Sequence, residues 1–324
     1  MAISPKNKRI TAHRKGAPAG PAEEGNPPGN GGYGAGRVPS RLVQVLGWLC
    51  VFASAFCFYL ATTVIRWAKA ETTLEPSVFV LARFLIGFAV ICIIMILRRK
   101  GPQPRRYNLL LGRAVFNFMA VYFFYKAVAV TSVAEGNILN MTYPVFIALF
   151  SWIFMRKQRD PLGVAMVALA FAGIWLILTP GDFRFRTESL WGLASGVTAA
   201  FAILSLNLSR QYHDSETVLF YMFGLGAVIT YPIFYHEIIL PDATGFYYLG
   251  LCSLYGVGGQ YLLTLGFRYV TAVEGGIISS TRILLAALLG PVMAADPPLT
   301  AAGWVGAVLL FVANVVLAGR RVRG

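Results

Sequence analysis

Two stretches of the chain have nearly the same sequence, TSVAEGNILN at residues 131–140 and TAVEGGIISS at residues 271–280. Each stands at the start of a long apolar run. Each stretch places a glutamate beside a glycine, Glu135 in the first and Glu274 in the second. A shift of 140 residues without a gap gives nine identities over the 42 positions that begin at residue 130, where about four or five are expected by chance in such apolar sequence. The repeated phrase therefore indicates an internal duplication.

The composition indicates that the lipid bilayer is the solvent of this chain. Of its 324 residues, 57% are hydrophobic and 13% are charged, whereas an average soluble domain has about 25% charged residues. All four cysteines fall within apolar segments, so no disulfide framework is expected. Segments of about 20 apolar residues are long enough to cross a membrane. We predict ten such helices, at residues 44–65, 76–97, 108–127, 133–155, 161–179, 189–209, 216–235, 246–267, 275–295 and 299–318.

The basic residues lie in the tails and in alternate loops. Residues 1–42 are rich in lysine, arginine, glycine and proline, and we predict a disordered basic tail there. The loops at 98–106 and 156–159 are basic, whereas those at 182–188 and 237–242 are near neutral or acidic. By the positive-inside rule, we expect the basic loops and both termini to face the cytoplasm. The expected location is a bacterial cell membrane. The same rule accounts for the net charge of +14, so no nucleic-acid partner is expected.

The duplication divides the chain into two repeats of five helices, at 43–180 and 189–319. It pairs the fourth and fifth predicted helices with the ninth and tenth. Because five is odd, the second copy enters the membrane with the opposite polarity. Inverted repeats of this kind are typical of secondary transporters, whose binding site lies near the membrane midplane between the copies. We expect an all-α integral membrane protein with ten transmembrane helices in two inverted five-helix repeats.

Two segments of the first repeat carry a family resemblance. The proline-led helix PSVFVLARFLIGFAV, at 76–90, and the segment YKAVAVTSVAEGNILNMTYPVFIALFSWIF, at 125–154, resemble the EamA-type branch of the drug/metabolite transporter superfamily. The resemblance covers about residues 44–318. It implies ten helices in two inverted repeats and a central cavity that opens alternately to each side of the membrane.

The chain departs from the usual pattern of that family at two places. An acidic residue commonly follows the fourth and ninth helices, but only Asp160 and Asp296 lie nearby here. The second copy also has Arg282 at the position where the first has Thr142. Because of these departures, the resemblance does not predict the loop contacts or the coupling mechanism of this chain.

Two arginines are the principal site candidates, because an ionised group at membrane depth costs roughly 2.5–3.5 kcal/mol and normally faces a cavity or a partner. Arg83 lies about 10 Å down the second helix and Arg282 about 13 Å into the ninth, at 1.5 Å per residue. Arg282 shares a helical stripe with Ser279 and other small residues. Guanidinium suits carboxylate or phosphate, and no acidic residue lies deep in any predicted helix. The bracing of neighbouring helices is the alternative role for Arg83, and a distant ion pair or extension to the membrane surface is the alternative for Arg282.

Buried amides complete the predicted binding set. Asn137 and Asn140 lie on one face of the fourth helix, before Pro144, which removes a helical hydrogen bond. They bind either a ligand or a neighbouring helix. Asn117 and Gln260 are further cavity candidates. Arg113 lies close enough to the cytoplasmic end of its helix to extend to the membrane surface, so we rank it below Arg282.

The two glutamates of the repeated phrase have two interpretations. A carboxylate near a helix N-terminus is stabilised by about 0.3–1 kcal/mol, which explains Glu135 and Glu274 without a transport role. Alternatively, they are gating or proton-coupling sites, because a carboxylate that is desolvated on closure has its pKa raised.

The competing functions differ in what they require. An intramembrane enzyme needs a nucleophile, base or metal set, yet the three histidines share no helix with a carboxylate at ligand spacing, and no catalytic motif is present. We expect no catalytic residues, cofactor or metal. A channel or a receptor explains the deep arginines less well. We predict a secondary-active transporter of a small anionic or zwitterionic metabolite, such as an amino acid, with the bilayer as its other partner and a homodimer left open. The alternatives are an exporter of lipophilic cations and an intramembrane enzyme.

Overall fold

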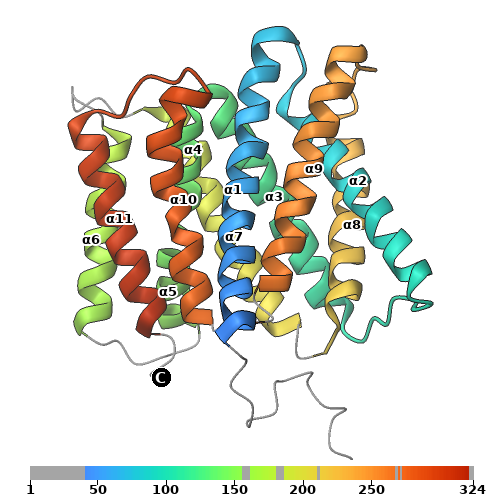
Figure 1. Cartoon of the computed structure of the whole chain (residues 1–324), viewed down its shortest axis with the longest axis horizontal. Helices are drawn as coiled ribbons and strands as arrows, with labels where there is room; N and C mark the ends of the chain where they lie inside the picture. The colour runs from blue at the N-terminus through green and yellow to red at the C-terminus, as the bar shows by residue number, and fades with distance from the viewer. Residues whose placement is uncertain are drawn as a thin grey trace, which may run out of the picture. The chain divides into compact units, whose positions relative to one another are not determined.

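The computed structural model describes residues 41–154, 161–179, 186–209, 212–266, 269–270 and 272–320. Residues 1–40 of the predicted basic tail, the basic loop at 156–159, Asp160, Asp182 and the arginines beyond residue 320 lie outside this part of the chain. The last two residues of that predicted tail, 41 and 42, are helical and begin α1. The described residues form α-helices and one 3-10 helix (Figure 1). In chain order these are α1 (Arg41–Glu71), α2 (Pro76–Leu97), α3 (Tyr107–Val130), α4 (Val133–Asn140), α5 (Tyr143–Phe154), α6 (Pro161–Leu178), η1 (Thr187–Ser189), α7 (Leu190–Ser209), α8 (Ser215–Phe234), α9 (Ala243–Gly266), α10 (Ala272–Met293) and α11 (Ala301–Arg320).

The fourth predicted helix is broken into α4 and α5. The backbone N–H of Met141 still donates to the Asn137 carbonyl, but Thr142 bonds back only three residues, to Leu139, through both its N–H (3.1 Å) and its hydroxyl (2.7 Å). Pro144 follows and has no N–H to continue the ladder. The kink expected from Pro144 is therefore a full interruption that begins three residues earlier.

Among the residues that the structure describes, eight helical segments are long and apolar enough to cross a membrane, counting Val133–Phe150 across the break as one. Ala301–Leu317 is a shorter apolar helix, and α9 is not among the eight. The helical pattern of the sequence prediction is thus present, while its count of ten membrane spans goes beyond what length and composition support.

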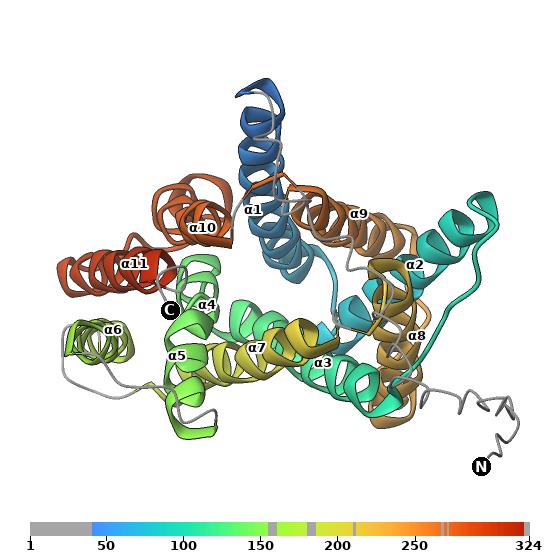
Figure 2. The ribbon, with the colours of Figure 1, turned by 90° about the horizontal axis from the view of Figure 1, so that it is seen from below.

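The two repeats interleave. Among the contacting helix pairs, five join one helix from each half of the chain: α1 with α9, α3 with α7, α2 with α8, α4 with α10, and α6 with α11. With α4 and α5 counted as one helix, each half of the chain has five helices, and each helix has a counterpart in the other half. Replacing each helix by its counterpart converts the α1–α9 pair into the α7–α3 pair and leaves the other three pairs unchanged. Figure 2 shows these pairs side by side when the bundle is seen from below. The contact pattern therefore has the internal symmetry of the duplication.

Small residues let two of these helices approach closely. A Cβ atom added at Gly173 of α6 would lie 2.7 Å from the carbonyl oxygen of Gly306 in α11, and one added at Gly306 would lie 2.6 Å from the carbonyl oxygen of Gly173. Such backbone proximity is typical of helix pairs in membranes, where packing replaces the hydrophobic effect.

Polar contacts tie the helices together at the end of the bundle that is uppermost in Figure 1, where α1 ends and α4 begins. Asp296, in the loop after α10, accepts a hydrogen bond from the backbone N–H of Val133 (2.6 Å) and lies 3.2 Å from Arg66 Nε. Burial raises the pKa of the Asp296 carboxyl, and the Val133 N–H and Arg66 oppose that shift. Trp67 donates to the Met293 carbonyl (2.7 Å) beside it. These contacts connect α1, α4 and α10 at the upper end.

Candidate functional site

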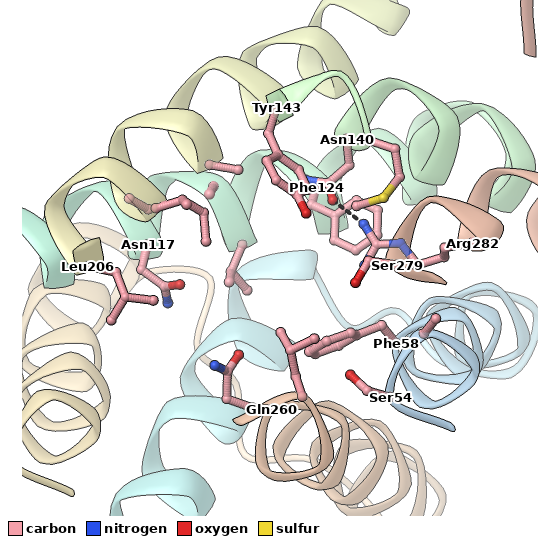
Figure 3. A pocket seen from close by; sticks show the side chains of 18 of the residues that line it. Ser54, Phe58, Asn117, Phe124, Asn140, Tyr143, Leu206, Gln260, Ser279 and Arg282 are labelled. Carbon is pink, nitrogen blue, oxygen red and sulfur yellow. Dashed lines mark hydrogen bonds between the residues drawn. The ribbon is translucent and has the colours of Figure 1, made fainter. Parts of the chain in front are cut away.

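A cavity of about 330 Å³ lies between the two repeats. Residues of α1, α2, α3, α4, α5, α7, α9 and α10 line it, so both halves of the chain contribute (Figure 3). Its lining on α7, α9 and α10 includes Leu206, Leu263 and Gly276, which lie close to the lower ends of those helices. The cavity therefore extends from the middle of the bundle toward the end at which α1 begins. Its volume is in the range that holds small organic ligands.

Arg282 projects into this cavity from α10 (Figure 3). Its side chain is 6% exposed, its Nη2 donates to the Asn140 Oδ1, and its Nε has no hydrogen-bond partner. The guanidinium carbon lies 5.3 Å from the centre of the Phe124 ring and 5.7 Å from that of Phe58. No ion pair among the described residues includes it. Of the two alternatives, extension to the membrane surface does not occur.

Asn140 connects Arg282 to the rest of the site. Its Nδ2 donates to the Ser195 hydroxyl (3.0 Å) on α7, and that hydroxyl donates to the Gly192 carbonyl (2.7 Å). The chain of hydrogen bonds therefore runs from the second repeat to the first and back again. Both ends of the Asn140 amide are used, which fixes its orientation toward the arginine.

Arg83 occupies the neighbouring part of the cavity wall, on α2. Its Nη1 donates to the Tyr125 hydroxyl (2.9 Å), and its guanidinium carbon lies 5.6 Å from the centre of the Phe58 ring. An added Cβ at Gly256 would lie 3.2 Å from its Cδ, so the glycine makes room for the arginine. Arg83 thus braces α2 against α3 and α9 and also faces the cavity.

Arg113 was expected from the sequence to extend to the membrane surface, and this expectation was wrong. It is 4% exposed and lines the cavity, and does not extend to the membrane surface. The sequence gives its depth along α3 but not the direction of its side chain, and here the cavity supplies the polar surface that the membrane face would otherwise provide. The site thus contains three arginines, from α2, α3 and α10.

The other predicted site residues divide into two groups. Asn117, Ser279 and Gln260 line the cavity together with Asn140 (Figure 3). Asn137 does not: it is fully buried and donates to the Thr62 hydroxyl (2.9 Å) and to the Val133 carbonyl (2.8 Å). Its amide therefore joins α4 to α1, which is the helix-binding alternative.

Sequence reasoning missed the aromatic part of the site. Phe58, Phe124 and Tyr143 line the cavity, and two of their rings contact guanidinium groups. None of these three aromatic residues is among the site residues predicted from the sequence. In a chain with 14% aromatic residues, no local signal separates a cavity ring from a packed one.

Glu135 lies outside this cavity, in the first turn of α4. Its backbone N–H donates to the Ser132 hydroxyl (3.0 Å), the N-cap of the helix. Its side chain accepts a hydrogen bond from Ser189 and lies 3.5 Å from Arg186 Nη1. Glu135 therefore links α4 to the segment that leads into α7. The side chain of Glu274 is outside the described part of the structure.

The charge of the cavity is one-sided. Three arginines line it, and none of the described lining residues is an aspartate or a glutamate. Such a surface attracts anionic ligands and repels cations. The other lining residues carry amides, hydroxyl groups and apolar side chains.

A bundle of long apolar helices whose two interleaved halves enclose a cavity that contains arginines and amides defines a multi-pass membrane protein of the transporter class. The EamA-like transporter family matches this chain twice, at residues 45–179 and 186–319, and the chain belongs to that family.

Named relatives agree with this class. The chain is 26% identical over 244 residues to the pseudopaline exporter CntI of Pseudomonas aeruginosa, covering 74% of this chain and 83% of that protein. It is 26% identical over 260 residues to solute carrier family 35 member G1 of Mus musculus, covering 74% and 70% respectively. A solved crystal structure with 20% sequence identity has the same fold, with a TM-score of 0.58 over 86% of this chain and 99% of the other.

Proposed function

We propose that this protein is a secondary-active transporter of a small organic metabolite that is anionic or zwitterionic, and that it works by alternating access. The observation that carries the proposal is Arg282, a buried guanidinium in a cavity between the repeats, with a neutral partner and no carboxylate partner among the residues that the structure describes. A permanent cation at that depth is costly without a counter-charge. A bound substrate anion supplies that charge.

The proposed binding set is the part of the predicted set that faces the cavity. Arg282 binds the anionic group, and Asn140 orients the guanidinium. Asn117, Ser279 and Gln260 contact the neutral part of the substrate, and Arg83 contributes positive charge from α2. Asn137 supports the position of α4 from outside the cavity.

The proposed topology has ten spans, and it counts α9 and α11, which miss the length and hydropathy requirement, as two of them. The basic loop after α2 then faces the cytoplasm together with both termini. In this orientation the cavity extends toward the cytoplasm. The exporter among the relatives supports outward transport across a cell membrane.

Arg282→Gln tests the proposal, with ligand-induced thermal stabilisation of the purified protein as the readout. Anionic, zwitterionic and cationic metabolites are compared, because a ligand that binds the native state raises its melting temperature. We expect one anionic or zwitterionic class to stabilise the protein and Arg282→Gln to lose about 1.5–3 kcal/mol of binding. Arg282→Lys keeps the charge but not the planar fork, and is expected to recover part of the binding.

Arg98→Gln is the matched control, because Arg98 pairs with Glu216 on an exposed surface away from the cavity. Unchanged binding and transport in Arg282→Gln would remove the arginine from the site. Stabilisation by lipophilic cations that is equal in both proteins would favour the multidrug alternative, for which the aromatic rings of the cavity are the supporting observation.

A further inference from the structure

We infer that the substrate is an acid whose carboxylate is held by Arg282 and whose other end carries an uncharged group that both donates and accepts hydrogen bonds, such as an amide. The inference rests on the proposed function, which places the anionic group at Arg282. Asn117 of α3 is the residue that recognises the uncharged end. It lines the cavity, and its side chain makes no hydrogen bond to another residue that the structure describes.

The two asparagines that line the cavity use their amides differently. The Oδ1 atom of Asn140 accepts from Arg282 and its Nδ2 donates to Ser195 (3.0 Å), so the protein occupies both ends of that amide. The amide of Asn117 is directed into the cavity, as is the guanidinium of Arg282 (Figure 3). An amide away from bulk water is stable only with partners for its donor and its acceptor. Asn117 therefore offers both to a ligand.

The cavity face of α3 gives the order of groups along the ligand. The ring centre of Phe124 lies 5.3 Å from the Arg282 guanidinium carbon, so Phe124 marks the level of the bound carboxylate. Asn117 precedes Phe124 by seven residues, which is two helical turns or about 10 Å along the axis. Between them α3 lines the cavity with Ala120 and Val121. Along this helix the order is thus guanidinium, one apolar turn and an amide.

An amide-like group complements Asn117 better than an alkyl or a charged group does. An alkyl end would displace water and leave the amide of Asn117 unpaired, and sites built for hydrogen bonds reject ligands that cannot make them. A carboxylate has only acceptors and an ammonium group only donors, so each would leave one end of the Asn117 amide without a partner. A ligand amide pairs with both ends.

The experiment uses matched acids and the purified full chain. Linear acids of increasing length that end in a primary amide are compared, by titration calorimetry, with acids in which an isopropyl group of the same shape replaces the amide. We expect one chain length of the amide to bind at least about tenfold more tightly than its isopropyl match. Both compounds carry one carboxylate, so the comparison isolates the uncharged end.

Two variants of Asn117 test its role. Leucine is close to asparagine in shape but forms no hydrogen bond, so in Asn117→Leu the preference for the amide should fall to about twofold or less, while the isopropyl acid binds as before or better. Asn117→Gln moves the same amide outward by one methylene group. It should keep the preference and shift it to an acid that is one methylene group shorter, which a purely structural role for Asn117 does not predict.

Three further variants are the controls. Arg282→Gln should weaken both acids together and leave their ratio unchanged, because both use the same carboxylate site. Ser54→Ala should also keep the ratio, since the Ser54 hydroxyl already donates to the Gly259 carbonyl (2.7 Å). Arg98→Gln, on an exposed surface, should change neither affinity. The melting temperature of each variant without ligand shows that it is folded.

The outcomes separate this inference from the proposed function. If the amide and its isopropyl match bind equally and Arg282→Gln weakens both, the amide-bearing acid is wrong and the anion transporter stands. The same follows if a dicarboxylate of matched length binds more tightly than the amide and Arg113→Gln removes that preference, or if only an unrelated anion binds through Arg282. If only lipophilic cations bind, both proposals fail.

Discussion

At the scale of single residues, the two asparagines of α4 show how one helical turn separates binding from packing. Asn140 reaches the cavity and holds Arg282, whereas Asn137 lies one turn above it and bonds to Thr62 of α1. The residues have the same chemistry and lie on the same helix. Only their neighbours distinguish them.

Alanine at these two positions is expected to give opposite results. Asn137→Ala removes two hydrogen bonds inside the bundle and should lower the free energy of unfolding by about 0.6–2 kcal/mol, with no change in substrate affinity. Asn140→Ala should weaken substrate binding about tenfold, because Arg282 loses the partner that orients it. Thermal unfolding with and without ligand measures both. Equal effects of the two variants on affinity would contradict the distinction.

At the scale of helices and loops, the ends of α4 carry the contacts between the repeats. Its first turn bonds to Asp296 after α10 and, through Glu135, to Ser189 and Arg186 before α7. Its last residue is Asn140, and the helix is interrupted there before α5 begins at Tyr143. The short helix is therefore held at both ends by the second half of the chain.

Glu135→Gln tests whether this attachment is a proton-coupled gate. Glutamine is uncharged at every pH, so it cannot form the ion pair with Arg186 or release it on protonation. We expect transport by this variant to become independent of the pH gradient while substrate affinity is retained. Transport is followed in proteoliposomes with and without an imposed gradient. Glu216→Gln, which removes the separate ion pair with Arg98, is the control. A gradient dependence equal to that of the unchanged protein would assign Glu135 to the structure alone.

Gly306→Ala tests the contact between α6 and α11. The added methyl group would meet the carbonyl oxygen of Gly173 at 2.6 Å, so the helices must separate. The expected cost is about 1–3 kcal/mol of stability. Gly258→Ala in α9 is the matched control, because no atom lies within 4 Å of the added Cβ, and it should be neutral or stabilise the protein by up to about 1 kcal/mol. Similar melting temperatures for the two variants would argue against the close contact.

At the scale of the bundle, the two ends differ. The upper end is joined by Asp296, Arg66 and Trp67, whereas the cavity reaches toward the lower end near Leu206 and Leu263. Under the proposed alternating access, a central cavity that extends to one side, with the other side held by polar contacts, corresponds to one of the two access states.

Cysteine labelling measures which side the cavity faces. In a background without the four native cysteines, Leu206→Cys should react with a membrane-impermeant thiol reagent added from the side of the N-terminus and be protected from the other side. Ile138→Cys, at a fully buried position of α4, should react from neither side. Labelling of Leu206→Cys only from the side opposite the N-terminus would overturn the proposed topology.

Much of the helical pattern was predictable because apolar runs in a membrane chain are long and end at charges. The prediction of 76–97 coincides with α2, where Pro76 starts the helix and Arg98 ends it. The first helix was predicted to end at 65 because Arg66 and Lys69 follow, yet α1 continues to Glu71. Arg66 is accommodated there by Asp296, which is 230 residues away in the chain. Helix ends that depend on such distant partners are not encoded locally.

The sequence by itself determined the apolar helices, the duplication and the arginines at membrane depth, because these follow from composition, periodicity and the cost of burying charge. The tertiary structure decided which face of each helix meets the cavity. It joined Arg83, Arg113 and Arg282 around one space, placed Asn137 outside it and added Phe58 and Tyr143. In a bundle whose helices are apolar nearly all round, periodicity carries little information about rotation. Packing between the two repeats supplies it.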